Sequence, residues 1–299
     1  MLVAIDLGGT KTFIGAYESG KFKEVKKVMT PKDVPLWRFI LNNLRNDFEA
    51  VSIATMGPLV LSEGKIVNNP HLPEKDQDLA LPLIKSLKRP VYVINDAVAG
   101  AWAEYKAQGC QNLVYIAFGT GIGVGVVVDG HLLLGKDGNA HEFGHVTLDM
   151  SSELSCGCGG KGHVEALLGG NNLPKFAKAH GINVKGAAEF FEKIYAGEER
   201  LYRAFEDTLL AFVSSVANAY DPECLVFGGG IFVKHKDLYM KVLAKLPNYK
   251  GLVVRAPKLK VSKYGELSAL YGAAFLAVDK PEHWLSKLTY LKTVGHPLD

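Results

Sequence analysis

The sequence lacks any apolar run long enough to cross a bilayer. A membrane helix needs about 20 predominantly apolar residues, and no uninterrupted apolar run in this sequence approaches that length. The N-terminus also lacks the basic stretch, followed by an apolar one, that marks a secretory signal. We therefore predict a cytoplasmic protein with no membrane partner.

The sequence has few cysteines and a small net charge. Four cysteines in 299 residues are too few to staple a secreted chain. Two of them, Cys156 and Cys158, lie among histidines, which favours a metal over a disulfide. The 34 basic and 31 acidic residues leave a formal charge of +3, too little to argue for nucleic-acid binding, which needs a concentrated basic face.

The hydrophobic and charged fractions, 48% and 22%, are typical of a globular protein, and the length favours two domains. Apolar strands alternate with amphipathic helices, a pattern that predicts a largely parallel sheet covered by helices, hence an α/β fold. The expected strands are 2–6, 12–17, 51–55, 91–95, 113–118, 123–128 and 224–227. The expected helices are 37–44, 79–87, 97–107, 205–220 and 268–278.

One element occurs twice: an apolar strand, a glycine turn and a second apolar strand, at 2–17 and again at 113–128. We interpret it as one element used once in each of two related α/β domains. The expected boundaries are a small α/β domain at 1–105, to which a C-terminal helix at about 279–299 can return, and a large α/β domain at 106–278.

The two glycine turns are candidate phosphate cradles. Glycine lets the backbone approach phosphate oxygens and offer N–H groups to them. The first turn, Gly8-Gly9-Thr10-Lys11, adds a hydroxyl and a mobile positive charge, and Asp6 before it could hold hydrated Mg²⁺. The second is Gly119-Thr120-Gly121. The plain alternative for both is a tight hairpin, and the GxxxxGK[ST] spacing of a Walker A loop is missing.

Polar pairs and clusters supply further candidates. Asn95-Asp96 follows a strand and precedes a helix, where an Asp is either a helix N-cap or a base that accepts a hydroxyl proton during phosphoryl transfer. His145, Cys156, Cys158 and His163 supply two imidazoles and two thiolates, which suit tetrahedral zinc. The alternative is a glycine-rich loop without metal.

Five motifs in this order resemble the ROK family of sugar kinases, within the actin/hexokinase-like superfamily, from Leu2 to about Ala277. They are DLGGTKT at 6–12, Asn95-Asp96, GTGIG at 119–123, EFGH at 142–145 followed by CGCGGKGHVE at 156–165, and VFGGGI at 226–231. The resemblance implies two actin/hexokinase-like (ribonuclease H-like) domains with a ligand cleft between them.

The resemblance also implies a role for each matched residue. Asp96 would be the catalytic base toward the sugar 6-hydroxyl. The sugar ligands would be Asn69, Asn95, Asp96, Glu142, His145 and Glu165. The nucleotide ligands would be Asp6, Gly8, Gly9, Thr10, Lys11, Gly119, Thr120, Gly121, Gly229 and Gly230. ATP and Mg²⁺ are the implied cofactors, and relatives are often dimers or tetramers, so a homodimer is a further expectation.

One residue departs from the family signature, because His163 stands where the family has its third cysteine. Two expectations stay open: zinc bound by His145, Cys156, Cys158 and His163, or a loop held by packing alone. If zinc is bound, His145 would serve twice, with one ring nitrogen on the metal and the other on the sugar.

The predicted function is an ATP-dependent hexokinase or glucokinase acting on glucose, with mannose, glucosamine and N-acetylglucosamine as possible further substrates. The alternative is a dedicated N-acetylated amino-sugar kinase, and the donor could also be ADP or polyphosphate. A sugar-sensing regulator is disfavoured because the first loop starts at Asp6, which leaves no room for a helix-turn-helix before it. An actin-like ATPase is disfavoured by the sugar signature at 142–165.

Overall fold

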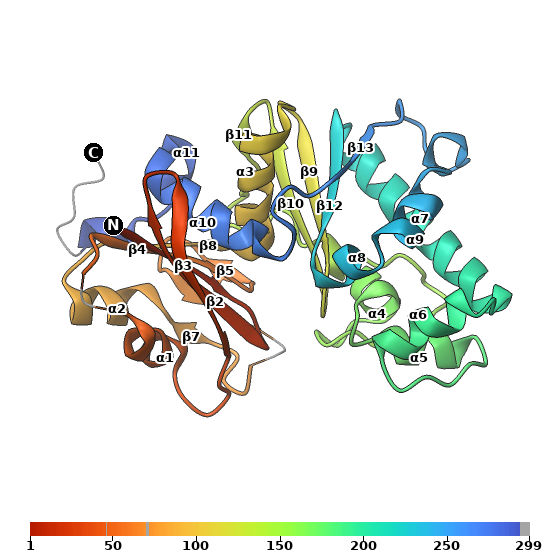
Figure 1. Ribbon diagram of the computed structural model, residues 1–299, viewed down its shortest axis with the longest axis horizontal. Coiled ribbons are helices and arrows are strands. Elements are labelled where there is room, and N and C mark those ends of the chain that lie inside the picture. The colour runs from red at the N-terminus through yellow and green to blue at the C-terminus, as the bar shows by residue number, and fades with distance from the viewer. Residues whose placement is uncertain (46, 70–71, 294–299) are drawn as a thin grey trace. The chain divides into compact units, whose positions relative to one another are not determined.

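The computed structural model describes residues 1–45, 47–69 and 72–293 (Figure 1). The chain divides into two compact units. Unit 1 comprises 1–109, 125–141 and 267–299, and unit 2 comprises 110–124 and 142–266. Among the described residues, no helix is both long enough and apolar enough to cross a bilayer.

Unit 1 is built on a five-stranded sheet in the order β3-β2-β1-β4-β8 (Figure 1). Its strands are β1 (Leu2–Leu7), β2 (Lys11–Glu18), β3 (Lys21–Met29), β4 (Ala50–Thr55) and β8 (Val91–Asn95). β1 pairs antiparallel with β2 and parallel with β4, and β4 pairs parallel with β8. Every residue of β8 is buried, as an apolar run in a parallel sheet requires.

The helices of unit 1 come from both ends of the chain. They are α1 (Leu36–Asn43), α2 (Ala80–Leu87), α3 (Asp96–Gln108), α10 (Ser268–Asp279), α11 (Glu282–Leu285) and α12 (Tyr290–Thr293). The smaller strands are β5 (Leu59–Val60), β6 (Lys65–Ile66), β7 (Gln77–Asp78) and β11 (His131–Leu132), which pairs with the end of β10 (Ile122–Val128). The small residues of α10 pack on α3 and also on β1 and β4.

Unit 2 contains three parallel strands: β9 (Leu113–Phe118), β12 (Cys224–Gly228) and β13 (Lys258–Val261). Its helices are α4 (Val164–Leu168), α5 (Leu173–Ala179), α6 (Ala187–Tyr195), α7 (Glu199–Tyr220), α8 (Gly230–Lys234) and α9 (Lys236–Leu243), with 3₁₀ turns η1 (Phe143–His145), η2 (Leu246–Asn248) and η3 (Gly265–Leu267). Aromatic rings fill its core, where Phe118 contacts Phe212, Phe232 and Tyr239.

A disulfide joins Cys110 to Cys224, with an S–S distance of 1.96 Å. Our sequence analysis weighed a disulfide only for Cys156 and Cys158, which are free, and made no prediction for this pair. Cys110 directly precedes the segment that enters β9, and Cys224 begins the neighbouring β12. The sequence separation of 114 residues hid a pairing that only the parallel register brings together.

The unit boundaries differ from the sequence boundaries at 105/106 and 278/279. Unit 1 extends to Gly109 and also takes 125–141 and all residues from Leu267 on. The reason for the second difference is the packing of α10 against α3, β1 and β4, which no single-segment pattern reveals. Of the expected C-terminal segment 279–299, residues 279–293 belong to unit 1, and the last six residues lie outside the described residues.

Candidate active site

Asn95 and Asp96 lie where β8 ends and α3 begins. Asn95 Oδ1 accepts hydrogen bonds from the backbone N–H groups of Ala97 (2.9 Å) and Val98 (3.2 Å), so Asn95 is the N-cap. Asp96, the residue that we weighed as a cap, is instead the first residue of the helix. One of its oxygens, Oδ1, accepts a 2.7 Å bond from the Ala97 N–H.

Asp6, at the end of β1, interacts electrostatically with Asp96. Burial raises the pKa of the Asp96 carboxyl to about 6, although the hydrogen bond from the Ala97 N–H opposes that rise. Burial, and then the charge of Asp96, raises the pKa of Asp6 well above its usual range. Two half-buried carboxyls, one of them further disfavoured in its charged form by the other, provide a place where a cation, or a proton taken from a substrate, is stabilised.

The first glycine turn is held by a residue that our sequence analysis missed. Thr30 Oγ1 donates a 2.7 Å hydrogen bond to the carbonyl of Gly8, and the Thr30 N–H donates to the carbonyl of Thr10 at 3.0 Å. Thr10 and Lys11 are exposed. The turn therefore has a fixed backbone with its hydroxyl and ammonium groups facing solvent, as an anion-binding loop needs.

Asn69 is almost fully buried, with 1% of its surface exposed. Its Nδ2 donates to the carbonyl of Gly57, and its backbone N–H donates to the carbonyl of Lys75 at 3.0 Å. The side-chain amide thus pins one segment of unit 1 to another.

The second glycine turn in unit 2 is tied to Glu165. The Gly119 N–H donates to the carbonyl of Gly121 at 3.0 Å, and Glu165 Oε2 accepts the Ile122 N–H at 3.2 Å. A side chain at Gly121 would overlap the Glu165 carboxylate, so the close approach requires glycine there. One carboxylate therefore sets the position of the turn.

A second contact to this turn comes from the segment after α4, which our sequence analysis did not single out. The Gly170 N–H donates to the carbonyl of Gly119 at 3.0 Å, and the Asn171 N–H donates to the carbonyl of Thr120 at 3.1 Å. Hydrogen bonds between backbone groups do not require particular side chains, so only the glycines could have indicated this contact in the sequence.

Gly229 and Gly230 follow β12 and begin α8. Gly229 has φ +86°, and a Cβ there would lie 2.5 Å from the carbonyl oxygen of Phe118, the last residue of β9. Only glycine fits, because both the left-handed backbone and the close approach exclude a side chain. The motif thus lies at the carboxyl end of a parallel strand, the usual place for ligands in α/β sheets.

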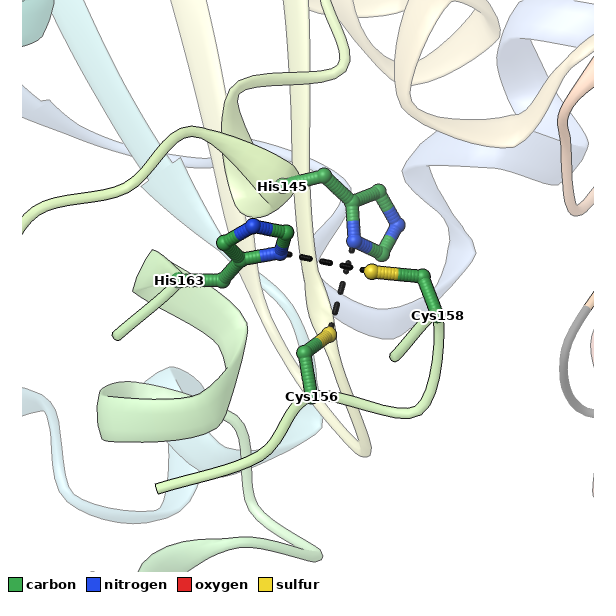
Figure 2. A group of neighbouring side chains, drawn as sticks. All are labelled: His145, Cys156, Cys158 and His163. Carbon is green, nitrogen blue, oxygen red and sulfur yellow. Dashed lines mark hydrogen bonds between the residues drawn. The ribbon is translucent and has the colours of Figure 1, made fainter. Parts of the chain in front are cut away.

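The four candidate metal ligands form one cluster (Figure 2). Nδ1 of His145 lies 3.5 Å from the Sγ of Cys156, and Nδ1 of His163 lies 3.3 Å from the Sγ of Cys158. All four ligand atoms lie within 4.8 Å of one another. Ligands of tetrahedral zinc lie 2.0–2.3 Å from the ion, so the cluster fits zinc after a small contraction.

The candidate sugar ligands of unit 2 surround this cluster. His145 Nε2 lies 3.9 Å from Glu142 Oε2, so the two ring nitrogens of His145 face different partners. Glu165, at the start of α4, accepts a contact from the Cys156 thiol at 3.6 Å. Burial raises the pKa of that thiol to about 12. Glu142 and Glu165 therefore lie against two of the four candidate ligands, His145 and Cys156, where outer partners of a metal site commonly orient its ligands.

The candidate residues are divided between the two units. Unit 1 holds Asp6, Gly8, Gly9, Thr10, Lys11, Asn69, Asn95 and Asp96. Unit 2 holds Gly119, Thr120, Gly121, Glu142, His145, Cys156, Cys158, His163, Glu165, Gly229 and Gly230. The ROK family model matches residues 2–280, which include all of them. The chain belongs to the ROK family.

Two sugar kinases show how similar the chain is to its relatives. It is 40% identical to a glucokinase of Pyrobaculum calidifontis over 84% of this chain and 83% of that protein. It is 32% identical to an N-acetylmannosamine kinase of Shigella flexneri over 92% and 98%. A glucokinase and a kinase of an N-acetylated amino sugar are therefore both among its relatives.

A solved ROK structure matches the fold. The ROK family glucokinase of Streptomyces griseus, in complex with glucose and AMPPNP, superposes with a TM-score of 0.76 at 25% identity and covers 93% of this chain and 99% of that one. The predicted α/β fold of the actin/hexokinase-like class is confirmed. The chain is an enzyme of the sugar-kinase type, a phosphotransferase that acts on a sugar hydroxyl.

Proposed function

We propose that this ROK chain is an ATP-dependent glucokinase that phosphorylates the 6-hydroxyl of glucose. The observation that carries the proposal is Asp96, a buried carboxyl whose pKa is raised to about 6 and whose usual capping role is filled by Asn95. The 40% identity to a glucokinase, and the similarity to a glucokinase in complex with glucose and AMPPNP, support glucose and ATP as substrates.

In the proposed reaction Asp96, ionised near neutral pH, accepts the proton of the sugar 6-hydroxyl. The hydroxyl oxygen forms a bond to the γ-phosphorus while the bond between that phosphorus and the bridging oxygen breaks, and ADP leaves with the electron pair. Phosphoryl transfer depends mainly on positioning and charge neutralisation, so one positioned base is enough.

The nucleotide is assigned to the glycine turns. Backbone N–H groups of Gly8-Gly9 and of Gly119-Gly121, with the hydroxyls of Thr10 and Thr120 and the ammonium of Lys11, suit phosphate oxygens. Gly229 and Gly230 offer bare backbone to the adenosine. The pinning of the two phosphate turns by Thr30 and Glu165 supports this assignment, because a fixed turn binds without an ordering cost.

Two cations complete the proposal. Asp6 would hold Mg²⁺, and its raised pKa beside Asp96 is what a carboxyl shows where a cation is expected. Mg²⁺, when bound, neutralises phosphate charge. His145, Cys156, Cys158 and His163 would hold zinc, which supplies a rigid anchor for the loop.

The sugar ring hydroxyls are assigned to Glu142, His145 and Glu165 of unit 2, and to Asn69 and Asn95 of unit 1. Carboxylates and imidazole are natural partners of hydroxyl groups, and a site that hydrogen-bonds each hydroxyl discriminates strongly. A second candidate is an N-acetylated amino-sugar kinase, which the 32% identity to an N-acetylmannosamine kinase favours.

Initial rates on glucose, mannose, glucosamine, N-acetylglucosamine and N-acetylmannosamine, with Mg²⁺ and with ATP, ADP or polyphosphate, test the proposal. The expected result is the highest kcat/KM for glucose with ATP. A preference for an N-acetylated sugar would replace glucose by the second candidate. ATP turnover that no sugar accelerates would contradict both.

The proposal also sets the compartment and the assembly. A kinase that consumes ATP works where ATP is maintained, so we place it in the cytoplasm. The resemblance to ROK kinases predicts a homodimer. The mass of the protein in solution, measured by light scattering, tests that prediction.

A further inference from the structure

Three parallel strands of unit 2 end at one edge, and each leads into a loop there (Figure 1). β9 leads into Gly119 and β12 into Gly229, the two turns already described. β13 leads into the loop 262–266, which our sequence analysis did not single out. Because ligands of α/β sheets bind at the carboxyl ends of the strands, this third loop lies where a nucleotide is expected.

The third loop has a defined backbone. The Ser262 N–H donates to the carbonyl of Phe227, the residue before the glycine motif, at 2.8 Å. The Gly265 N–H donates to Ser262 Oγ at 2.8 Å. The first bond fixes the start of the loop to β12, and the second closes the loop on itself before its last residue, Glu266.

The Glu266 carboxylate lies beside the glycine motif. A Cβ built at Gly230 would lie 3.1 Å from Glu266 Oε1, so the carboxylate is within contact distance of the backbone that α8 begins with. Glu266 is exposed. An exposed carboxylate placed against bare backbone at a ligand edge can meet a ligand directly.

A carboxylate selects one end of a nucleotide. Ionised, it only accepts hydrogen bonds, and its charge repels phosphate. The hydrogen-bond donors of ATP at the nucleoside end are the ribose hydroxyls and the adenine 6-amino group. We propose that Glu266 is a specificity-determining residue that accepts a hydrogen bond from the nucleoside of the phosphoryl donor. This inference rests on the proposed function and names the residue that would recognise the nucleoside of the bound nucleotide.

The alternative is a purely structural role. α8 begins after Gly229 with no side-chain cap, so the Glu266 charge could simply favour the positive end of that short helix. A capping role would change stability and would weaken all nucleotides by one factor. A recognition role would affect only ligands that carry the recognised donor group.

Direct binding, measured by calorimetry without sugar, separates the two roles. The probes are ATP, 2′-deoxy-ATP, 3′-deoxy-ATP, ITP and inorganic tripolyphosphate. The proteins are wild type, Glu266→Ala, Glu266→Gln and the control Asp237→Asn, which removes an exposed carboxylate of α9 (99% exposed). Glu266→Gln keeps the shape of the side chain if the alanine variant fails to fold.

We expect Glu266→Ala to weaken ATP binding roughly tenfold, the cost of one hydrogen bond to a charged group. Tripolyphosphate and the analogue that lacks the recognised donor should bind both proteins alike. If Glu266→Ala does not weaken binding of a deoxy analogue, the missing ribose hydroxyl is the group that Glu266 binds. If it does not weaken binding of ITP, that group is the adenine 6-amino group. Glu266→Gln should fall between wild type and alanine, and Asp237→Asn should match wild type.

Equal weakening of every probe, or unchanged ATP binding, would overturn the proposal. The assay needs no acceptor, so its failure is separable from failure of the proposed function. If the protein binds ATP but phosphorylates no sugar, only the proposed function fails. If it phosphorylates glucose and Glu266→Ala does not discriminate among the nucleotides, only this inference fails.

Discussion

Nδ1 of His145 lies 3.5 Å from the Sγ of Cys156, and this pair couples the candidate metal cluster to the candidate sugar ligands. The other nitrogen of the same ring lies 3.9 Å from Glu142 Oε2. An imidazole held on one side by metal and on the other by a carboxylate has a fixed tautomer and orientation. We therefore propose that the cluster, with a metal bound, orients the candidate sugar ligand His145.

The first prediction concerns zinc content. Protein purified without chelator should contain about one zinc per chain, and a strong chelator should lower its melting temperature, because a structural site contributes folding free energy. His163→Ala should lose the metal while His163→Cys keeps it, since thiolate and imidazole both serve zinc. Elemental analysis and thermal melts measure this. His180→Ala, which lies outside the cluster, is the control.

Absence of zinc from wild-type protein, together with a melting temperature that the chelator leaves unchanged, would show that packing alone holds the loop. In that case His163→Ala and His163→Cys should behave alike.

The second prediction concerns the Cys110–Cys224 disulfide. It closes a loop with a sequence separation of 114 residues, and cross-links of long loops typically contribute about 2–4 kcal/mol. Urea unfolding with and without reductant should differ by about that amount. Cys110→Ala should show the lower stability in both conditions. A stability that reductant does not change in wild type, with the thiols titrated as free, would contradict the bond.

The third prediction concerns a single methyl group. Gly121→Ala would bring a side chain into the Glu165 carboxylate, whereas Gly119→Ala, in the same turn, meets nothing within 4 Å. We therefore expect Gly121→Ala to displace Glu165 and to raise the KM for glucose about tenfold or more, while Gly119→Ala leaves the KM for glucose near wild type. Steady-state kinetics at saturating ATP decide between them. Equal effects on the sugar would contradict the tie between the turn and Glu165.

The fourth prediction concerns pH. The base must be ionised, and burial raises the pKa of Asp96 to about 6. The kcat/KM for glucose should therefore fall about tenfold per pH unit below about 6 and level off above it. A profile that is flat down to pH 4.5 would mean that another group governs the rate.

Stability should run the opposite way through the same window. The folded protein holds its Asp96 proton up to about pH 6, whereas the unfolded chain releases it near pH 4. The folded state binds more protons between these values, so this group makes stability fall as pH rises from about 4 to 6. Asp96→Asn should remove that component, which urea unfolding at pH 4.5 and pH 7 would show.

Much of the fold could be predicted from local sequence. Periodicity and turn residues located β1, β9 and α3 to within about a residue, because those elements are buried and strongly patterned. β3 was missed because it lies at the edge of the sheet and its side chains are mostly exposed. The side chains of such a strand do not alternate between core and solvent, so the sequence lacks the alternation of apolar and polar residues that identifies a strand.

The candidate site divides in the same way. The motifs identified the glycine turns and the Cys/His cluster, because their chemistry needs particular residue types at short spacing. Thr30, Asn171 and Glu266 were missed because they reach the turns from distant segments through only one or two contacts each. Asn95 was read only as a ligand, although it is also the helix cap. Spacing alone cannot tell which of two neighbouring polar residues caps a helix.

The most direct test of the account is the rate of phosphoryl transfer by Asp96→Asn in a single turnover with ATP and glucose. The account predicts a fall of about 10²–10⁴-fold, the usual contribution of a positioned base, with glucose and ATP still bound at near wild-type affinity and with Asp33→Asn, an exposed carboxylate, unaffected. Transfer by Asp96→Asn at close to the wild-type rate would contradict the account.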